Sequence, residues 1–328
     1  MRRRVIWQLY RVGISACTWY PRGDTCQSLY HAQAMGVNKE LSILAERACE
    51  AALAAGRVIT SYTAGQVVVH YKEGGDSLAS QVVTEVDEQS QAAILEVLAP
   101  TLASHDLALL TEELADDGSR FEKDYFWCID PMDGTLPFTQ GKPGYAVAIA
   151  LIRRDGEPMI GVVYDPVRER LYRAVAGQGL WINEDKWRLP LAESAGDCFY
   201  FYVDCTFESD SLRDVMTAQM QALAQRMGYA RSVIEVHGGA VSSACHVLEN
   251  PPSAYIKPPK PELGGGSFWD FGATACIFQE AGAYARDYAG QRLELNSATH
   301  AFFNHCGVCF CSDPALAECV QAELRVTS

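Results

Sequence analysis

Apolar and polar residues along the first half of the chain follow two different spacings. Between residues 38 and 58 the apolar positions recur every third or fourth residue, which predicts an amphipathic helix. A second helix is predicted from Asp87 to about Leu98, behind acidic residues that suit a helix N-terminus, and a strand at 66–71. Farther on, short apolar runs separated by glycines and an Asp-Pro pair predict an antiparallel meander of strands at 125–129, 145–152, 159–164 and 170–174.

The second half of the chain alternates strand and helix patterns, as an α/β unit does. Residues 251–266 interrupt this alternation with five prolines and three consecutive glycines, so a loop is expected there. The strands are predicted at 199–203, 233–236 and 307–311, and the helices at about 210–227, 241–248 and 270–281.

These patterns predict two closely packed halves, an N-terminal α+β half at 38–190 and a C-terminal α/β half at 191–328. Residues 1–37 look unlike the rest and are interpreted as an N-terminal extension, a candidate for disorder or the product of an upstream start codon. The arginines at 2–4 imitate an export signal, but Gln8 and Arg11 interrupt its apolar region. Because no window approaches the roughly 20 apolar residues of a membrane span, we expect a cytoplasmic protein without membrane contact.

Composition narrows the choice of partner. The chain is 48% apolar and 21% charged, as in soluble globular proteins. Its formal net charge of -14 would repel nucleic acid and anionic membranes, so neither is expected as a partner. A small anionic substrate would need positive charge supplied locally, by metal ions, helix N-termini or a few basic side chains.

The twelve cysteines are spread along the chain and are interpreted as reduced thiols. One dense group superficially resembles a zinc site, but its segment 306–311 is a short apolar run bounded by turn residues, which favours a buried strand. A second ligand pair with finger-like spacing is also missing. The residues of this group are His300, His305, Cys306, Cys309 and Cys311.

The strongest chemical signal is the run Asp130-Pro131-Met132-Asp133-Gly134-Thr135, which directly follows an apolar strand. Two carboxylates three residues apart at a strand end can converge on one point, and carboxylate oxygens are preferred ligands of Mg²⁺. Pro131 fixes the turn, while Gly134 and Thr135 offer unhindered backbone amides to a phosphate. An ordinary Asx-Pro turn would not need all of these positions, so phosphate chemistry is favoured.

Other acidic residues stand where apolar elements begin or end. Glu112 and Glu113 follow an apolar run, Asp87 follows Val82-Val83-Thr84, and Asp270 follows Phe268-Trp269. Taken separately they are a solvated loop, a helix-start charge and a helix N-cap.

Taken together these segments resemble the inositol monophosphatase superfamily, which includes 3'(2'),5'-bisphosphate nucleotidases and fructose-1,6-bisphosphatases. The resemblance runs from about residue 38 to 312 and keeps the order and spacing of the motifs. It implies a layered α-β-α-β-α sandwich of the sugar-phosphatase type. The motifs are Val-Thr-x-x-Asp at 83–87, Glu112-Glu113, Asp130 to Thr135, and Trp269-Asp270 followed by Glu280-Ala281-Gly282.

The resemblance also implies a metal-dependent, lithium-sensitive phosphatase with two or three Mg²⁺ per site and a metal-activated water. A homodimer is implied as well. One ion would be held by Glu112, Asp130 and the Met132 carbonyl, and a second by Asp130, Asp133 and Asp270. The implied catalytic residues are Asp87, Thr135 and Glu112, of which Asp87 and Thr135 would orient or deprotonate the water.

Substrate choice stays open at this point. After Thr135 the chain has Leu136-Pro137-Phe138, which matches neither the inositol phosphatases nor the nucleotidases. Lys257 stands where inositol phosphatases place an acidic residue, so it could meet a second phosphate or be a solvated loop lysine. Gly134, Thr135, Gly239, Ala240 and Lys257 are the candidate substrate-binding residues. The leading substrate is inositol monophosphate or a similar sugar-alcohol phosphate, the nearest rival a bisphosphate nucleotide, and a non-catalytic regulatory protein the distant alternative.

Overall fold

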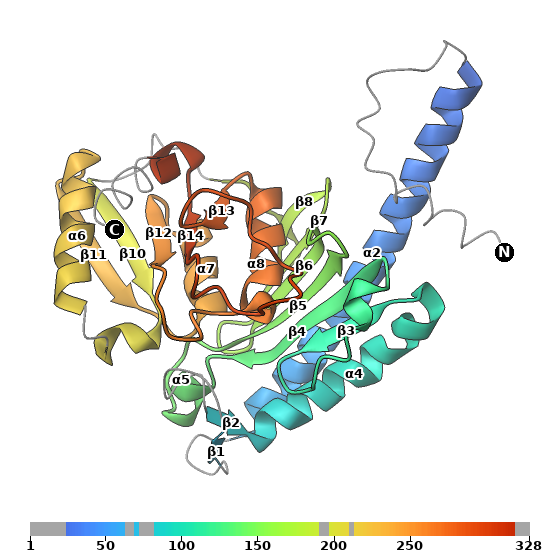
Figure 1. Cartoon of the computed structure of the whole chain (residues 1–328), viewed down its shortest axis with the longest axis horizontal. Coiled ribbons are helices and arrows are strands. Elements are labelled where there is room, and N and C mark those ends of the chain that lie inside the picture. The colour runs from blue at the N-terminus through green and yellow to red at the C-terminus, as the bar shows by residue number, and fades with distance from the viewer. Residues whose placement is uncertain (1–23, 63–68, 72–81, 190–196, 210–212, 319–328) are drawn as a thin grey trace.

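A computed structural model of the chain describes residues 24–62, 69–71, 82–189, 197–209 and 213–318. Its helices and sheets form five layers, which confirms the expected α-β-α-β-α sandwich (Figure 1). Helices α2 (Asp24–Ser61) and α4 (Glu85–His105) form the first layer, and α7 (Ala240–Glu249) and α8 (Phe268–Ala281) lie between the two large sheets. Helix α6 (Arg213–Arg226) covers the far sheet.

The seven-stranded sheet has the order β3-β4-β5-β6-β7-β8-β9. β3 is parallel to β4, and the remaining neighbours are antiparallel, so the predicted meander is confirmed. Its strands are β3 (Ala108–Thr111), β4 (Tyr125–Asp133), β5 (Ala146–Arg153), β6 (Pro158–Asp165), β7 (Arg170–Val175), β8 (Gly179–Ile182) and β9 (Asp185–Lys186).

The five-stranded sheet has the order β11-β10-β12-β14-β13. β10 runs parallel to β11 and β12, and β14 is antiparallel to both of its neighbours. Its strands are β10 (Cys198–Val203), β11 (Arg231–Val236), β12 (Ser253–Lys257), β13 (Tyr284–Asp287) and β14 (Val308–Cys311). The remaining elements are a small antiparallel pair, β1 (Val69–Tyr71) and β2 (Val82–Thr84), the short helix α5 (Thr135–Thr139), and the 3-10 turns η2 (Ser119–Phe121) and η4 (Cys205–Ser209).

Three predicted boundaries change. Helix α2 begins at Asp24, well before residue 38, so the expected extension is helical over its last part. The expected loop at 251–266 contains strand β12, which is buried between β10 and β14. The strand expected at 66–71 is described only from Val69 to Tyr71, and residues 66–68 lie outside the described part. None of the described helices is long and apolar enough to cross a membrane.

Strand β5 explains how one sheet carries helices on both faces. Its larger residues Val147, Ile149 and Leu151 pack in the core beneath α2 and α4. Its opposite face is mostly alanine and packs in the core that contains α7 and α8. Successive side chains of a strand point to opposite faces, so this alternation gives α8 a flat, small-residue surface to approach.

Gly161 on β6 shows how close that approach is. A Cβ at Gly161 would lie 2.3 Å from the Ala273 carbonyl oxygen of α8, which is far inside van der Waals contact. On the α8 side, a Cβ at Gly272 would lie 3.2 Å from the Cβ of Ala150. The distance between α8 and the sheet therefore depends on the absence of a side chain at residue 161.

We expect Gly161→Ala to lower the free energy of unfolding by about 1–3 kcal/mol, because the added methyl group would push backbone against backbone. Chemical denaturation measures this directly. Ile160→Val is the control, since Ile160 packs on the opposite face of the same strand and should lose about 0.5–1.5 kcal/mol without displacing α8. A Gly161→Ala protein as stable as the wild type would contradict this account of the packing.

Candidate metal centre

Two of the predicted metal ligands lie at the end of β4. Asp130 and Asp133 are 1% and 9% exposed, and the β4–β5 register shifts between them. A regular strand would send residues three apart to opposite faces, so this irregularity allows both carboxylates to face the same side. The Met132 amide donates to Asp130 Oδ1 at 2.9 Å, and the chain then turns at Gly134, whose φ is +89°.

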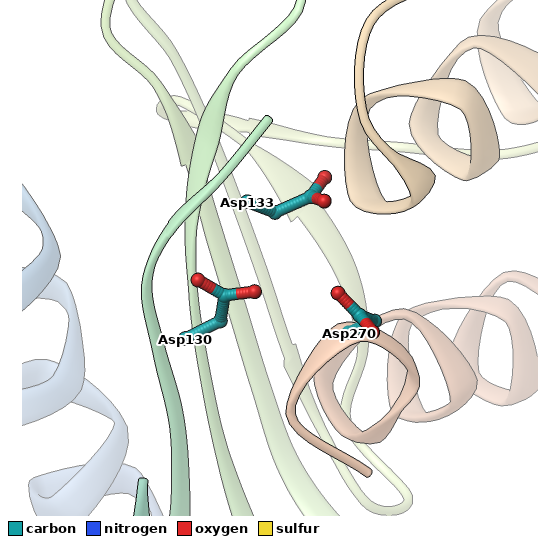
Figure 2. Close-up of side chains that lie close together, drawn as sticks. All are labelled: Asp130, Asp133 and Asp270. Atoms are coloured by element: carbon teal, nitrogen blue, oxygen red, sulfur yellow. The ribbon is translucent and has the colours of Figure 1, made fainter. Parts of the chain in front are cut away.

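The third predicted ligand, Asp270, comes from the first turn of α8. Its Oδ2 accepts hydrogen bonds from the Ser267 amide at 2.6 Å and the Ser267 hydroxyl at 2.8 Å, which form a capping box. The cap fixes the side chain and leaves its other oxygen available. Figure 2 shows Asp130, Asp133 and Asp270 directed toward a common space, and each offers an oxygen within 4.8 Å of the others.

Glu112 lies beside this group but is not one of the three. It follows β3, and its amide donates to the Ile129 carbonyl at 3.2 Å, so its loop is fixed against the strand that carries Asp130. After burial, the charge of Glu112 is the strongest influence that raises the pKa of Asp130. The structure thus brings all four predicted acids together near the end of β4.

Burial disfavours the charged form of all three carboxylates, and neighbouring acids disfavour that of Asp130 and Asp133 further. Burial raises the pKa of Asp130 well above its ordinary value, and Glu112, Asp270 and Asp133 raise it further. The pKa of Asp133 is raised to about 8 by burial and by Asp270, although amides of α7 oppose the shift. Burial also raises the pKa of Asp270. A divalent cation would relieve this repulsion, and a set of hard carboxylate oxygens fits Mg²⁺.

The predicted catalytic pair also comes together. Asp87 is buried at the start of α4, where its Oδ2 accepts from the Thr84 amide and hydroxyl, both at 2.7 Å. The Thr135 hydroxyl lies 3.0 Å from Asp87 Oδ1 and 3.1 Å from the Met132 carbonyl. A hydroxyl has one proton, so it can donate to only one of these acceptors at a time.

Helix α7 begins directly above Asp133. The amides of Ala240 and Val241 donate to the two oxygens of the Asp133 carboxylate, at 3.2 and 2.8 Å. A Cβ at Gly239 would lie 2.2 Å from Asp133 Oδ2, so glycine is required for this approach. The predicted substrate-side residues Gly239 and Ala240 therefore lie against a metal-ligand candidate.

Three glycines allow the loops around this helix end to touch backbone to backbone. A Cβ at Gly134 would lie 2.6 Å from the Gly144 carbonyl oxygen, and one at Gly144 would lie 2.6 Å from Gly238 Cα. All three have positive φ, and the Gly144 carbonyl accepts from the Gly239 amide at 2.8 Å. The contact joins the loop after β4 to the start of α7.

Lys257 is not a solvated loop lysine, so that alternative is wrong. It ends strand β12, and its Nζ lies 2.6 Å from Asp204 Oδ2. Burial alone would lower the pKa of Lys257, but Asp204 raises it above its ordinary value, and Asp270 and Asp133 contribute to the rise. The ammonium is therefore part of the electrostatics of the carboxylate group.

Sequence reasoning missed Asp204, which follows β10 and is 7% exposed. Its Oδ1 accepts from the Thr206 amide at 3.0 Å and from the Thr206 hydroxyl, and its Oδ2 from the Tyr255 hydroxyl at 3.3 Å. Burial alone would raise the pKa of Asp204, but Lys257 and the two Thr206 donors lower it. The sequence offers one indication of Asp204, namely that this acidic residue directly follows an apolar strand.

The cysteine-rich segment forms a strand, as predicted. Cys309 and Cys311 lie in the fully buried β14, and burial raises the pKa of the Cys309 thiol well above its ordinary value. His300 and His305 stack on each other with ring centroids 4.1 Å apart. Among the described residues, the group of three or more metal-ligating side chains that converge is Asp130, Asp133 and Asp270.

The layered sandwich and its three converging carboxylates define an α/β protein with a candidate cation site. Comparison with known proteins gives the family: the model of the inositol monophosphatase family matches residues 40–325, so the chain belongs to that family. A "Nus factor SuhB" of Pasteurella multocida is 32% identical over 71% of this chain and 84% of its own length. An "Inositol-1-monophosphatase" of Synechocystis is 38% identical over 44% of this chain and 47% of its own.

Solved structures confirm the fold. The crystal structure of the suppressor protein suhB from Bartonella henselae has a TM-score of 0.67 at 20% identity, and the match covers 86% of this chain and 98% of that one. At this identity the similarity concerns the fold.

We expect the cation-free protein to become more stable as the pH falls from about 9 to about 6. Asp133 has a pKa of about 8 in the folded chain but should titrate near its ordinary value when unfolded, so the folded state takes up protons first. Stability is then gained as the pH drops through the folded-state pKa. Thermal unfolding in chelator at several pH values measures the effect.

Saturating Mg²⁺ should remove most of this dependence, because the cation replaces the protons. Asp133→Asn is the matched variant and should show a weaker dependence in chelator. A melting temperature in chelator that is constant or rises with pH would refute the electrostatic account.

Proposed function

We propose that this protein is a Mg²⁺-dependent phosphomonoesterase that hydrolyses a small, soluble phosphate ester, such as inositol monophosphate or a similar sugar-alcohol phosphate. The observation that carries the proposal is the convergence of Asp130, Asp133 and Asp270 beside the Asp87–Thr135 pair. Cation ligands next to a hydroxyl–carboxylate pair are the parts that water attack on a phosphate requires. Family membership supports the reaction class.

The acids divide into two groups of ligands in this proposal. Glu112, Asp130 and the Met132 carbonyl would hold one Mg²⁺, and Asp130 would share a second with Asp133 and Asp270. Bound Mg²⁺ would supply charge that stabilises the phosphate oxygens and favours the nucleophilic water. Without such charge, a dianionic phosphate would be repelled by an acidic protein.

The Asp87–Thr135 pair would position the attacking water and take its proton. Asp87 Oδ2 is already occupied by two donors from Thr84, so its Oδ1 is the oxygen that faces Thr135. When the Thr135 hydroxyl donates to Asp87, its oxygen can accept a hydrogen bond from water. The proton of the water can then pass to the carboxylate through the hydroxyl.

The substrate would lie between these groups and the start of α7. The amides of Gly134 and Thr135 are proposed to bind the phosphate, and Gly239 and Ala240 to contact its organic part. The N-terminus of α7 carries partial positive charge, which favours electron-rich groups at this position.

The direct test is phosphate release from inositol 1-phosphate and from adenosine 3',5'-bisphosphate, each with Mg²⁺ and with chelator. Mg²⁺-dependent release from inositol 1-phosphate supports the proposal, and lithium inhibition would be expected with it. Release from neither ester, by protein that is folded and binds Mg²⁺, would contradict hydrolysis of this substrate class.

Light scattering tests the further expectation of a homodimer, and cell fractionation tests that of a cytoplasmic location.

Lys257 favours a second candidate, a 3'(2'),5'-bisphosphate nucleotidase. Its ammonium raises the positive potential near Asp133 and Asp270, where a polyol subsite would favour acceptors for hydroxyl groups. A second phosphate on the leaving group could pair with this ammonium. Leu136-Pro137 departs from the nucleotidase pattern and weighs against this candidate.

The relatives named "Nus factor SuhB" favour a third candidate, a regulatory protein that binds metal or phosphate without turnover. Cation binding with no phosphate release from any tested ester would support it. A carboxylate stands at each position where the family resemblance implies one, at Glu112, Asp130, Asp133 and Asp270, and this argues for turnover.

Asp133→Asn should lower kcat/KM by at least about 100-fold, since even residues that only support a ligand typically cost 10- to 100-fold. Initial-rate assays at saturating Mg²⁺ measure the change. Asp165→Asn is the control, because Asp165 is also buried and accepts the amides of Val167 and Arg168, but in the turn after β6. Equal activity of Asp133→Asn and wild type would refute the mechanism.

Replacing the pair Asp204 and Lys257 tests the substrate. The double variant Lys257→Met, Asp204→Asn avoids leaving a buried charge unpaired. If a second phosphate meets Lys257, kcat/KM for adenosine 3',5'-bisphosphate should fall about 10-fold, or about 1.4 kcal/mol, while that for inositol 1-phosphate changes little. Lys186→Met, an exposed lysine on β9, is the control. Equal loss on both substrates would contradict selective recognition.

A further inference from the structure

Arg120 is a buried arginine that lies between two of the acid-bearing segments. It is 4% exposed and occupies the 3-10 turn η2, on the connection that leads from Glu112 to Asp130. A buried guanidinium is costly unless its donors are paired. Its partners therefore indicate what it holds together.

The guanidinium donates to two separate segments. Its Nε donates to Asp116 Oδ2 at 2.8 Å, which fixes the loop that begins at Glu112. Its Nη1 donates to Asn296 Oδ1, and its Nη2 to the Ser297 carbonyl at 3.0 Å, which fixes the connection from β13 to β14. The side-chain amide of Asn296 also donates to the Arg154 carbonyl at 2.7 Å, so this connection is tied to the end of β5 as well.

The faces of the same guanidinium contact aromatic rings. Its central carbon lies 4.0 Å from the Phe121 ring centroid and 5.7 Å from that of Phe268. Phe268 is fully buried, begins α8 and stands two residues before Asp270. Its amide donates to the Ala301 carbonyl at 3.0 Å, so the connection held by Arg120 also holds the first turn of α8.

We infer that Arg120 is a positioning residue of the cation centre: it fixes the Glu112 loop against the start of α8 and thereby sets the spacing of Glu112 and Asp270 around Asp130. The inference rests on the proposed function only in taking this centre to bind a divalent cation. It assigns Arg120 no contact with substrate or cation.

Arginine suits this place for a geometric reason. Its planar fork donates to several acceptors at once and its faces stack on rings, whereas lysine offers a compact ammonium. Arg120→Lys keeps the charge but cannot maintain the bonds to Asp116, Asn296 and Ser297 together. The substitution therefore separates the charge of residue 120 from its role in holding the segments.

The experiment measures Mn²⁺ binding to the substrate-free protein by calorimetry, well below the melting temperature of each variant. We expect Arg120→Lys to bind Mn²⁺ about 10-fold more weakly, the usual size of an effect transmitted through a supporting residue. Its phosphatase activity should be recovered when the Mg²⁺ concentration is raised. The activity of a variant that was only less stable would not recover in this way. Arg153→Lys is the matched control, because Arg153 makes a similar two-pronged bond to Asp155 in the β5–β6 turn.

A second variant guards against misfolding. Asn296→Ala leaves Arg120 in place and removes one of its acceptors, so a smaller loss of Mn²⁺ affinity in the same direction is expected. Arg120→Lys that binds Mn²⁺ as tightly as the wild type would overturn the inference while leaving the proposed function intact. Absence of Mn²⁺ and Mg²⁺ binding by the wild type would instead remove the proposed function, and the inference with it.

Discussion

Repulsion among carboxylates held close together is the constraint on which this structure depends. Asp130 and Asp133 are buried, Asp270 is partly buried, and each offers an oxygen within 4.8 Å of the others. Each is restrained by donors that are themselves part of the fold: the Met132 amide, the first amides of α7 and the Ser267 cap of α8. Secondary structure thus keeps these carboxylates close together despite their repulsion, an arrangement that favours binding of a cation.

The layers explain how such restraint is achieved. Helix α8 can place Asp270 opposite β4 only because the facing surface of the first sheet is built from alanines and Gly161. Helix α7 can reach Asp133 only because three loops meet at glycines. The helices between the two sheets therefore serve the site as well as the core, since both carry a donor or a ligand at their first turn.

The sequence predicts local parts of this arrangement well and distant parts poorly. The run from Asp130 to Thr135 could be interpreted directly, because the strand, the turn and both carboxylates are adjacent in the chain. The grouping with Asp270 depended on family resemblance, since nothing in the surrounding residues indicates which surface α8 will pack on.

Two errors have physical causes. Strand β12 was taken for a loop because prolines flank it on both sides, although its own five residues are mostly buried. Asp204 was missed because a single acid after a strand has no pattern, and its partner Lys257 is adjacent only once β10 and β12 pair. Conversely, the positions of Asp130 and Asp133 at the end of a strand could be predicted, because the motif that contains them is continuous in the sequence.

The positions of the three carboxylates along the chain have a consequence for the protein during its synthesis. The seven-stranded sheet is complete by Lys186, and it already contains Asp130 and Asp133. Asp270 and the amides of α7 emerge from the ribosome much later, on helices that lie between the two sheets. The nascent chain therefore carries only part of the carboxylate group for a long stretch of translation, and the group is complete only after α7 and α8 have docked on the first sheet.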